Sequence, residues 1–426
     1  MTTDTLHAGM AEATRLTRSG RLDEATVLIR RMLRGGFTPD TSSHTPDYSG
    51  NEPIDGTFRV IDGIPQLTPP PDSGVAADGS RHTAGASAAA PPSSACDATL
   101  RSLRTGLGSR IAKPSPAHPD ILAGGRFVAG SFAQQAGTRS YKLYISSGYH
   151  GQALPLIVML HGCTQDPNDF AAGTRMNVLA EREGFFVLYP EQSSQANSSR
   201  CWNWFKAGDQ HRDQGEPSII ADMTRHIVRT HAIDGGRVYV AGLSAGGAMA
   251  MVMGVNYPEL YAAIGVHSGL PYGAAHDLPS AFAAMQHRET AALLQQGSGF
   301  PAALKALRIV PTIVFHGDRD TTVHPGNGDR VLAQWAAVHS GAGRDSGAGR
   351  KLRVTANRGQ VPKGHSYTHS IYHDASGQIV MERWLVHGAG HGWSGGSPHG
   401  SYTEPKGPNA SEEMVRFFRK HSQVKL

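Results

Sequence analysis

A serine flanked by glycines stands where an apolar run of the chain meets a stretch of small residues. The segment Gly242-Leu-Ser244-Ala-Gly246 follows RVYVA and precedes a pattern that predicts a helix. A sharp turn from strand to helix exposes a serine Oγ, and glycines on either side avoid clashes there. The helix N-terminus then favours developing negative charge. We interpret Ser244 as a nucleophile, with a purely structural turn as the alternative.

A nucleophilic serine needs a base, and the base needs a carboxylate that orients it. In an open α/β sheet the three follow in the order Ser, Asp, His. The segment FHGDRDTTVHP offers Asp318 and Asp320, and we assign the acid to Asp320 because Asp318 lies nearer the strand end and braces the turn. The segment ERWLVHGAGHGWSGG offers His387 and His391. We assign the base to His391, in the glycine-rich loop, and a structural role to His387.

Acyl transfer at a serine also needs two hydrogen-bond donors for the oxyanion. We expect the backbone N–H of Ala245 to be one of them. The second belongs to the loop LHGCTQ, where we expect the N–H of Cys163, with Thr164 as the fallback. The segment CWNWF contains Trp202 and Trp204, which either contact an apolar substrate or belong to the core.

Cysteine spacing gives little sign of a metal or redox site. Cys96, Cys163 and Cys201 form no CxxC pair. Spacing alone leaves a Cys163–Cys201 disulfide and two free thiols as equal alternatives. The histidines of GHSYTHSIYH lie on a segment that alternates like a strand, and we find no glycine-rich phosphate loop. We therefore predict no metal and no cofactor.

Apolar runs alternate with helical patterns from about residue 121 onward. Runs typical of strands buried on both faces of a parallel sheet are LPLIVMLHG, GFFVLYP, RVYVAGLS, AAIGVHSG, PTIVFHGD and IVMERWLVHG. The alternating segment RSYKLYIS predicts an edge strand. Helical patterns cover 171–183, 217–231, 245–257, 328–338 and 409–421. This order predicts a doubly wound, mostly parallel α/β sheet, with a small cap at 270–309.

Residues 1–120 have a different character from the α/β domain at 121–426. Residues 1–35 predict a helical hairpin, which cannot bury its apolar faces alone and is expected to dock, dimerise or bind a partner. Residues 36–120 are rich in Pro, Gly, Ala and Ser, which predicts a disordered linker. Within it, GTFRVIDGIPQL predicts a short strand or a docking segment.

Charge and hydropathy exclude several classes of partner. The formal net charge is +5, but Lys and Arg form no dense run, so we predict no nucleic-acid binding. No apolar run reaches the length of a membrane span. The N-terminal segment MTTDTLHAGMAEATRLTRSG has no apolar signal core, which predicts a cytoplasmic location.

Five segments together resemble the polyhydroxybutyrate (PHB) depolymerase family of esterases, which is related to feruloyl and acetyl xylan esterases. They are LHGCTQDPNDFAAGTRMNVLAEREGFFVLYPEQ, CWNWF, AGLSAGGAMA, FHGDRDTTVHPGN and LVHGAGHGWSGGSPHGSYTEPKGPNASEEMVRFF. The resemblance spans roughly residues 126–421 and implies an α/β-hydrolase fold. It implies Ser244 as nucleophile, Asp320 as acid and His391 as base. It also implies that Cys163 pairs with Cys201.

The resemblance implies hydrolysis of carboxylic esters through an acyl-enzyme. The expected substrate is poly(3-hydroxybutyrate) or its oligomers, and the alternative is a feruloyl, acetyl or other small ester. A granule-associated or scaffolding protein, with the N-terminal hairpin as its functional part, is the alternative of another class. The three catalytic residue types in the required order argue against it. The secreted members of the family make an extracellular location the alternative to the cytoplasm.

Overall fold

The computed structural model describes residues 125–287, 310–339 and 352–423, together with two short strands. These strands, β1 (Arg59–Ile61) and β2 (Ile64–Gln66), pair antiparallel, in agreement with the short strand expected in GTFRVIDGIPQL. The hairpin predicted at 1–35, and the linker predicted at 36–120 apart from this pair, lie outside the described residues.

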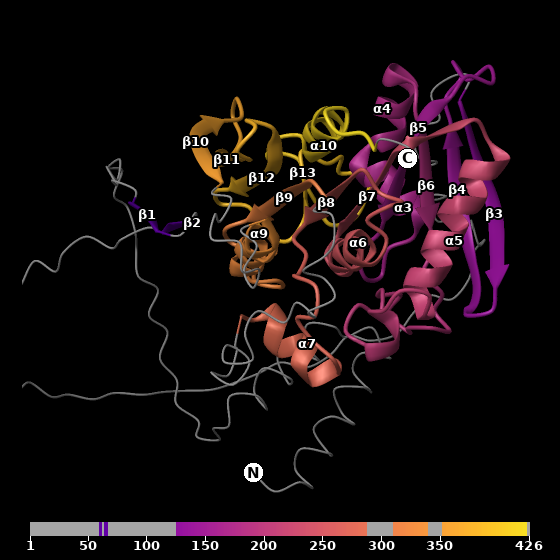
Figure 1. Cartoon of the computed structure of the whole chain (residues 1–426), viewed down its shortest axis with the longest axis horizontal. Coiled ribbons are helices and arrows are strands. Elements are labelled where there is room, and N and C mark those ends of the chain that lie inside the picture. Colours follow the sequence, from indigo (N-terminus) through magenta and orange to yellow (C-terminus); the bar gives the residue numbers. More distant parts are fainter. Residues whose placement is uncertain (1–58, 62–63, 67–124, 288–309, 340–351, 424–426) are drawn as a thin grey trace, which may run out of the picture. The chain divides into compact units, whose positions relative to one another are not determined.

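Ten strands form one mixed sheet in the order β10-β11-β12-β9-β8-β7-β5-β6-β4-β3 (Figure 1). Its six central strands run parallel, and each corresponds to one of the predicted apolar runs. They are β12 (Ile379–Val386), β9 (Thr312–Gly317), β8 (Ala263–His267), β7 (Ile233–Leu243), β5 (Leu154–Leu160) and β6 (Phe186–Pro190). The predicted doubly wound, mostly parallel α/β sheet is confirmed.

Antiparallel strands flank this parallel centre on both sides. They are β10 (Arg353–Gln360) and β11 (Ser366–His373) on one side, and β4 (Gly137–Ile145) and β3 (Arg126–Gln134) on the other. The prediction that RSYKLYIS forms an edge strand is wrong, because β4 pairs with both β3 and β6. Only Tyr141 to Tyr144 reach the short β6, so the first half of β4 has a single neighbour and alternates in burial.

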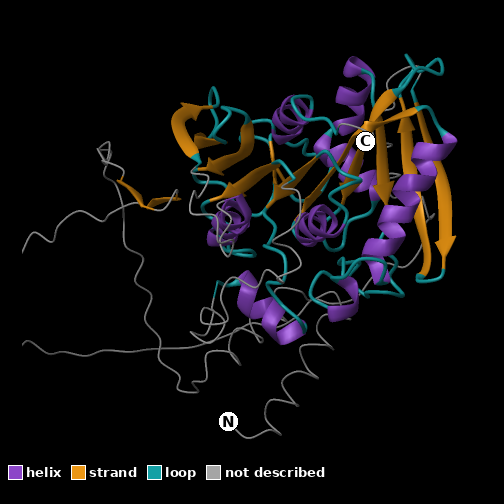
Figure 2. Ribbon diagram, in the orientation of Figure 1, coloured by secondary structure: helices purple, strands orange, loops and turns teal. Residues whose placement is uncertain are grey.

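Helices cover both faces of the sheet (Figure 2). On one face lie α5 (Gly215–Thr230), α6 (Ala245–Asn256) and α9 (Gly326–His339), and on the other α3 (Pro167–Thr174), α4 (Met176–Glu183) and α10 (Ala410–Phe418). Successive residues of β5 belong to different cores: Leu156 and Val158 pack with the first set of helices, and Ile157 and Met159 with the second. A strand buried on both faces is therefore apolar at every position.

One helical prediction needs correction. The helix expected at 171–183 is two helices, because Arg175 adopts a left-handed conformation (φ 53°) and separates α3 from α4. Asp166 begins α3 by accepting hydrogen bonds from the N–H groups of Asn168 and Asp169. In the predicted cap, α7 (Leu278–Met285) is present, while 288–309 lie outside the described residues.

Three short elements complete the secondary structure in the described ranges. They are the 3₁₀ helix η1 (Ala207–Asp209) and the two-residue strands β13 (Trp393–Ser394) and β14 (Thr403–Glu404), which pair in parallel. Among the described helices, none combines the length and the hydropathy that crossing a bilayer requires.

Candidate active site

Ser244 stands at the turn between β7 and α6. Its backbone φ is 58° and its ψ is −120°, a conformation that a non-glycine residue holds only where its surroundings enforce it. A Cβ on Gly242 would lie 2.3 Å from the Gly246 carbonyl, and one on Gly246 would lie 2.1 Å from the Leu160 oxygen. The Ser244 N–H donates to the carbonyl of His267 at 2.9 Å. Close backbone packing therefore explains both glycines of the motif.

Asp320 and His391 are hydrogen-bonded across the loops that follow β9 and β12. The Nδ1 of His391 donates to Asp320 Oδ2 at 2.7 Å. Their side chains are 0% and 11% exposed. The other carboxylate oxygen accepts the N–H groups of Thr322 at 2.9 Å and Val323 at 2.8 Å. The carboxylate is thus held rigidly, and it fixes the imidazole with Nε2 as the remaining ring nitrogen.

The environment of Asp320 keeps its side chain ionised. Burial raises the pKa of Asp320, but hydrogen bonds from His316 and His391, and the charges of these two rings, together outweigh burial. They hold the pKa of the Asp320 carboxyl well below its usual range. The Nε2 of His316 lies 3.4 Å from Asp320 Oδ2 and also 2.9 Å from the carbonyl oxygen of Val323.

Asp318 and His387 form a second pair at the ends of the same two strands. The Nδ1 of His387 lies 2.9 Å from Asp318 Oδ2, and its Nε2 lies 2.9 Å from Thr368 Oγ1. The other oxygen of Asp318 accepts the N–H of Gly388 at 2.7 Å. Both ring nitrogens of His387 are therefore occupied within the protein, in agreement with the structural role expected for it.

The loops that carry Ser244, Asp320 and His391 converge at one edge of the sheet. The N–H of Arg319 donates to the carbonyl of Ala389 at 2.9 Å, which joins the aspartate loop to the histidine loop. His267 joins the serine to the segment that follows His391, because its carbonyl accepts the Ser244 N–H and its ring Nε2 accepts the N–H of Ser394 at 2.9 Å. No hydrogen bond joins the Ser244 hydroxyl to His391 in the described residues. Ligand-free sites commonly tighten this contact only when substrate binds.

The loop after β5 lies beside the serine. A Cβ built on Gly162 would be 3.6 Å from the Cβ of Ser244. The N–H of Thr164 donates to the Ser199 carbonyl at 2.7 Å, so the fallback oxyanion donor is already engaged. Ala245 is the first residue of α6, and the first N–H groups of a helix have no intrahelical partner. This geometry favours the N–H of Cys163 over that of Thr164 as the second oxyanion donor, alongside the N–H of Ala245.

A disulfide joins Cys163 to Cys201, with the two Cα atoms 4.2 Å apart. It connects the loop after β5 to the loop after β6, and so decides between the two alternatives that spacing left open. On its other side, the N–H of Gly162 donates to the side-chain oxygen of Gln165 at 2.9 Å. Both flanks of the loop beside Ser244 are therefore fixed.

The two tryptophans lie in the core. Trp202 is fully buried, with its ring centroid 5.6 Å from that of His161. Trp204 is 6% exposed and packs edge-to-face against Phe205. Of the two interpretations weighed for them, this burial favours packing over contact with a substrate.

Tyr402 is a residue at this site that the sequence interpretation missed. Its side chain is 45% exposed, its hydroxyl lies 3.2 Å from Thr164 Oγ1, and its ring centroid lies 6.4 Å from that of His391. It therefore links the histidine loop to the loop beside Ser244. The only signal in the sequence was an aromatic residue in the polar segment GSYTEP.

Two histidines of the segment GHSYTHSIYH lie close to carboxylates. His369 lies 2.9 Å from Glu382, and His365 lies 3.3 Å from Glu404. Across the residues that the structure describes, no group of three or more His, Cys, Asp or Glu side chains is arranged to hold a metal ion.

A serine on the turn after a central parallel strand, with helices on both sheet faces, defines an α/β-hydrolase fold. Residues 139–358, just over half of the chain, match the family described as "Esterase PHB depolymerase". The chain belongs to this family.

Three curated relatives illustrate the similarity. The chain is 34% identical over 266 residues to poly(3-hydroxyalkanoate) depolymerase C of Paucimonas lemoignei, covering 62% of this chain and 60% of that one. It is 28% identical over 254 residues to poly(3-hydroxybutyrate) depolymerase of Ralstonia pickettii, covering 57% and 48%. It is 29% identical over 197 residues to feruloyl esterase B of Thermothelomyces thermophilus, covering 43% and 65%. The chain thus spans less than two thirds of each relative.

Proposed function

We propose that this protein is a serine esterase that hydrolyses poly(3-hydroxybutyrate) or its oligomers. The observation that carries the proposal is the rigid Asp320–His391 pair at the same edge of the sheet as Ser244, which stands on a strained turn. Membership of the esterase family supports ester chemistry. Two relatives named as depolymerases of hydroxyalkanoate polyesters support the polyester substrate.

The first half of the reaction acylates the serine. The Nε2 of His391 takes the proton of the Ser244 hydroxyl, and Oγ attacks the ester carbonyl carbon. Asp320 stabilises the imidazolium that forms. The tetrahedral intermediate collapses, the bond to the leaving oxygen breaks, and His391 returns the proton to that oxygen. The alcohol end of the polyester leaves, and the acyl group stays on Ser244.

The second half releases the acyl group. His391 takes a proton from a water molecule, whose oxygen attacks the acyl carbon. The second tetrahedral intermediate expels Ser244, which regains its proton from His391, and a hydroxyacid leaves. In both halves the N–H groups of Ala245 and Cys163 donate to the oxyanion, which stabilises charge that exists only in the transition state.

Substitution of Ser244 tests the catalytic assignment. In Ser244→Ala, we expect turnover of p-nitrophenyl butyrate to fall by about 10⁴-fold or more, because no nucleophile remains. Ser268 is the matched control, since it directly follows the neighbouring strand β8, is fully buried and also has a positive φ (48°). Ser268→Ala should stay within about threefold of the parent. Equal activity in Ser244→Ala and the parent would overturn the proposal.

A substrate panel tests the polyester assignment against the second candidate. The relative named feruloyl esterase B favours small aryl or acetyl esters as that candidate. We expect 3-hydroxybutyrate release from amorphous polymer to exceed ferulate release from methyl ferulate and acetate release from acetylated xylan. The reverse order would replace the polyester with the small ester and leave the catalytic residues as assigned.

The Cys163–Cys201 disulfide supports the extracellular alternative for the location of this protein. Disulfides persist in oxidising compartments and are rare in the cytosol. Thiol titration of denatured protein from cells and from culture medium tests this proposal. One titratable thiol, from Cys96, is expected in the medium, and three thiols in protein found only in cells would restore the cytoplasmic assignment.

We propose three regions for the chain: a hairpin at 1–35 that dimerises or binds a partner, a linker at 36–120, and the esterase domain at 121–426. Along the chain, the ten-stranded sheet begins at β3, within the last of these regions. A variant without residues 1–120 should keep its activity on p-nitrophenyl butyrate and lose any self-association. Loss of activity in a folded variant would contradict these boundaries.

A further inference from the structure

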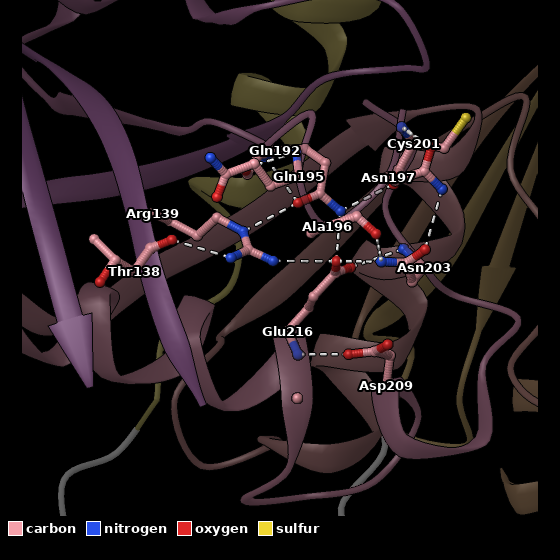
Figure 3. A network of polar contacts seen from close by, with 12 residues as sticks. Thr138, Arg139, Gln192, Gln195, Ala196, Asn197, Cys201, Asn203, Asp209 and Glu216 are labelled. Atoms are coloured by element: carbon pink, nitrogen blue, oxygen red, sulfur yellow. Dashed lines mark hydrogen bonds and ion pairs between the residues drawn. The ribbon is translucent and has the colours of Figure 1, made fainter. Parts of the chain in front are cut away.

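A buried carboxylate outside the proposed catalytic set lies in the first turn of α5 (Figure 3). Glu216 is 3% exposed. Its Oε1 accepts the side-chain amides of Gln192 at 2.5 Å and Asn203 at 2.6 Å, and it lies 3.3 Å from Nη2 of Arg139. Its Oε2 accepts the backbone N–H of Asn203 at 2.7 Å.

Burial, and then the charge of nearby Asp209, raise the pKa of Glu216, against the opposing effect of its hydrogen-bond donors and Arg139. Every partner of the carboxylate oxygens is nevertheless a donor, which suits an ionised carboxylate, because that group only accepts hydrogen bonds. Burying such a charge is unfavourable unless it is paired and hydrogen-bonded, and Arg139 together with the amides supplies both. A glutamine in place of Glu216 would keep the shape of the side chain, but its NH₂ group is a donor and would face other donors with no acceptor to bind. The side chains held by Glu216 are therefore fixed in one arrangement.

One route from Glu216 reaches the loop beside Ser244 through a histidine. The backbone N–H of Gln192 donates to Nε2 of His161 at 3.1 Å. The proton of that ring therefore lies on Nδ1, which donates to the carbonyl of Gly162 at 2.8 Å. Burial lowers the pKa of His161 to about 4, so the ring stays neutral and keeps this tautomer at neutral pH. Gly162 directly precedes Cys163.

A second route reaches the same loop through the disulfide. The side-chain amide of Gln192 donates to the carbonyl of Cys201 at 2.9 Å, as well as to Glu216. Cys201 is bonded to Cys163. Figure 3 shows Gln192 and Cys201 on the same side of the Glu216 carboxylate. Both routes thus pass through one glutamine and converge on Cys163, whose backbone N–H is the proposed oxyanion donor.

We propose that Glu216 is a positioning residue for the oxyanion site. Through Gln192 it holds the His161–Cys163 segment and Cys201 in register, and so aims the Cys163 N–H at the oxyanion. It touches no substrate. The proposal rests on the proposed function, since it needs an ester carbonyl that becomes an oxyanion at Ser244.

The test compares kcat and KM of Glu216→Gln with those of the parent on p-nitrophenyl butyrate. We expect kcat to fall by about 10- to 100-fold, because a displaced oxyanion donor acts only in the transition state. KM should change by less than about threefold. A trifluoromethyl ketone, which adds to the serine as an oxyanion, should bind more weakly by the same factor as kcat falls.

A matched control separates positioning from general loss of stability. Glu382 on β12 is also fully buried and also paired with an arginine, Arg416, but three strands separate β12 from β5. Glu382→Gln makes the same chemical change there, and it should lower the thermal midpoint while leaving kcat and inhibitor affinity unchanged.

A second variant keeps the test decisive if Glu216→Gln fails to fold. Gln192→Met preserves the side-chain length and the backbone N–H that His161 accepts. It removes the side-chain amide, which joins Glu216 to Cys201 and also accepts hydrogen bonds from Arg139 and the Ser193 N–H. It should show the same loss of kcat and inhibitor affinity. Parent-like kcat in folded variants at both positions overturns the positioning role while leaving the esterase assignment intact. Activity that survives Ser244→Ala would instead overturn the proposed function, and the positioning role with it.

Discussion

Two aspartate–histidine pairs lie at the ends of the same two strands, and they share one hydrogen-bond geometry. The outer pair, Asp318 and His387, is joined at 2.9 Å, and the inner pair, Asp320 and His391, at 2.7 Å. The outer side chains are 31% and 35% exposed, against 0% and 11% for the inner ones. Thr368 also occupies the second nitrogen of the outer ring. An Asp–His bond alone therefore does not identify a catalytic base; burial and a ring nitrogen left for a nucleophile are what favour His391 over His387 for the proposed role.

Substituting the two histidines gives the largest expected contrast between the pairs. His391→Gln should lower kcat on the order of 10⁴- to 10⁶-fold, because no base remains for the serine. His387→Gln should change kcat by less than about threefold, since its ring already bonds to Asp318 and Thr368. Steady-state kinetics with p-nitrophenyl butyrate measures both. Comparable losses in the two variants would break the distinction.

Substituting the two aspartates gives the next largest contrast. Asp320→Asn should lower kcat by about 10³- to 10⁴-fold, because an amide favours the wrong tautomer of His391 and stabilises no imidazolium. Asp318→Asn keeps the inner pair intact and should stay within about fivefold of the parent. The ratio of the two kcat values measures the contrast, and a ratio near one would contradict it.

Acid stability sharpens the description of the inner pair. The pKa of Asp320 in the folded protein lies below its usual range, so the unfolded chain binds a proton first as pH falls. The stability that Asp320 contributes is present above about pH 4 and is lost as pH falls toward the lower folded pKa. The side-chain amide in Asp320→Asn binds no such proton. Urea unfolding of both proteins across this range should show the parent's advantage shrinking with acidity, and parallel curves would contradict the assignment.

The smallest expected effect concerns the threonine of the outer pair. Thr368→Val removes the hydrogen bond to His387 while keeping a β-branched side chain on β11. The free energy of unfolding should fall by up to about 1.5 kcal/mol, with kcat unchanged. Thermal or urea unfolding together with the esterase assay checks both values. A drop in kcat would mean that the outer pair takes part in catalysis.

The parallel centre of the fold could be predicted because burial on both faces leaves a strong sequence signal. Runs such as LPLIVML are apolar at every position, and each predicted run became a strand. The flanking strands carry weaker signals: β3 and β10 are mostly exposed, and nothing in their composition pointed to them. The break at Arg175 was equally hidden, because a left-handed arginine depends on its surroundings rather than on its own preference.

The candidate site also contains residues that the sequence predicts and residues that it does not. Order along the chain and distance from the strand ends separated Asp320 from Asp318 and His391 from His387, and the structure joins Asp320 to His391. The bond between Asp318 and His387 was not predicted. Tyr402 could not be predicted from its position in the sequence, because its place beside His391 depends on how two long loops fold together. The Glu216 network was hidden for a similar reason. Its members come from four separate segments and form no motif.

The disulfide closes a covalent ring around part of this hydrolase. Cys163 and Cys201 lie 38 positions apart, and α3, α4 and β6 all lie inside the ring. A protease that cuts the chain once within the ring opens it but releases no fragment, so the nicked protein migrates as one species until it is reduced. The loop beside the serine therefore stays tethered on both sides even after its own connection to β6 has been severed.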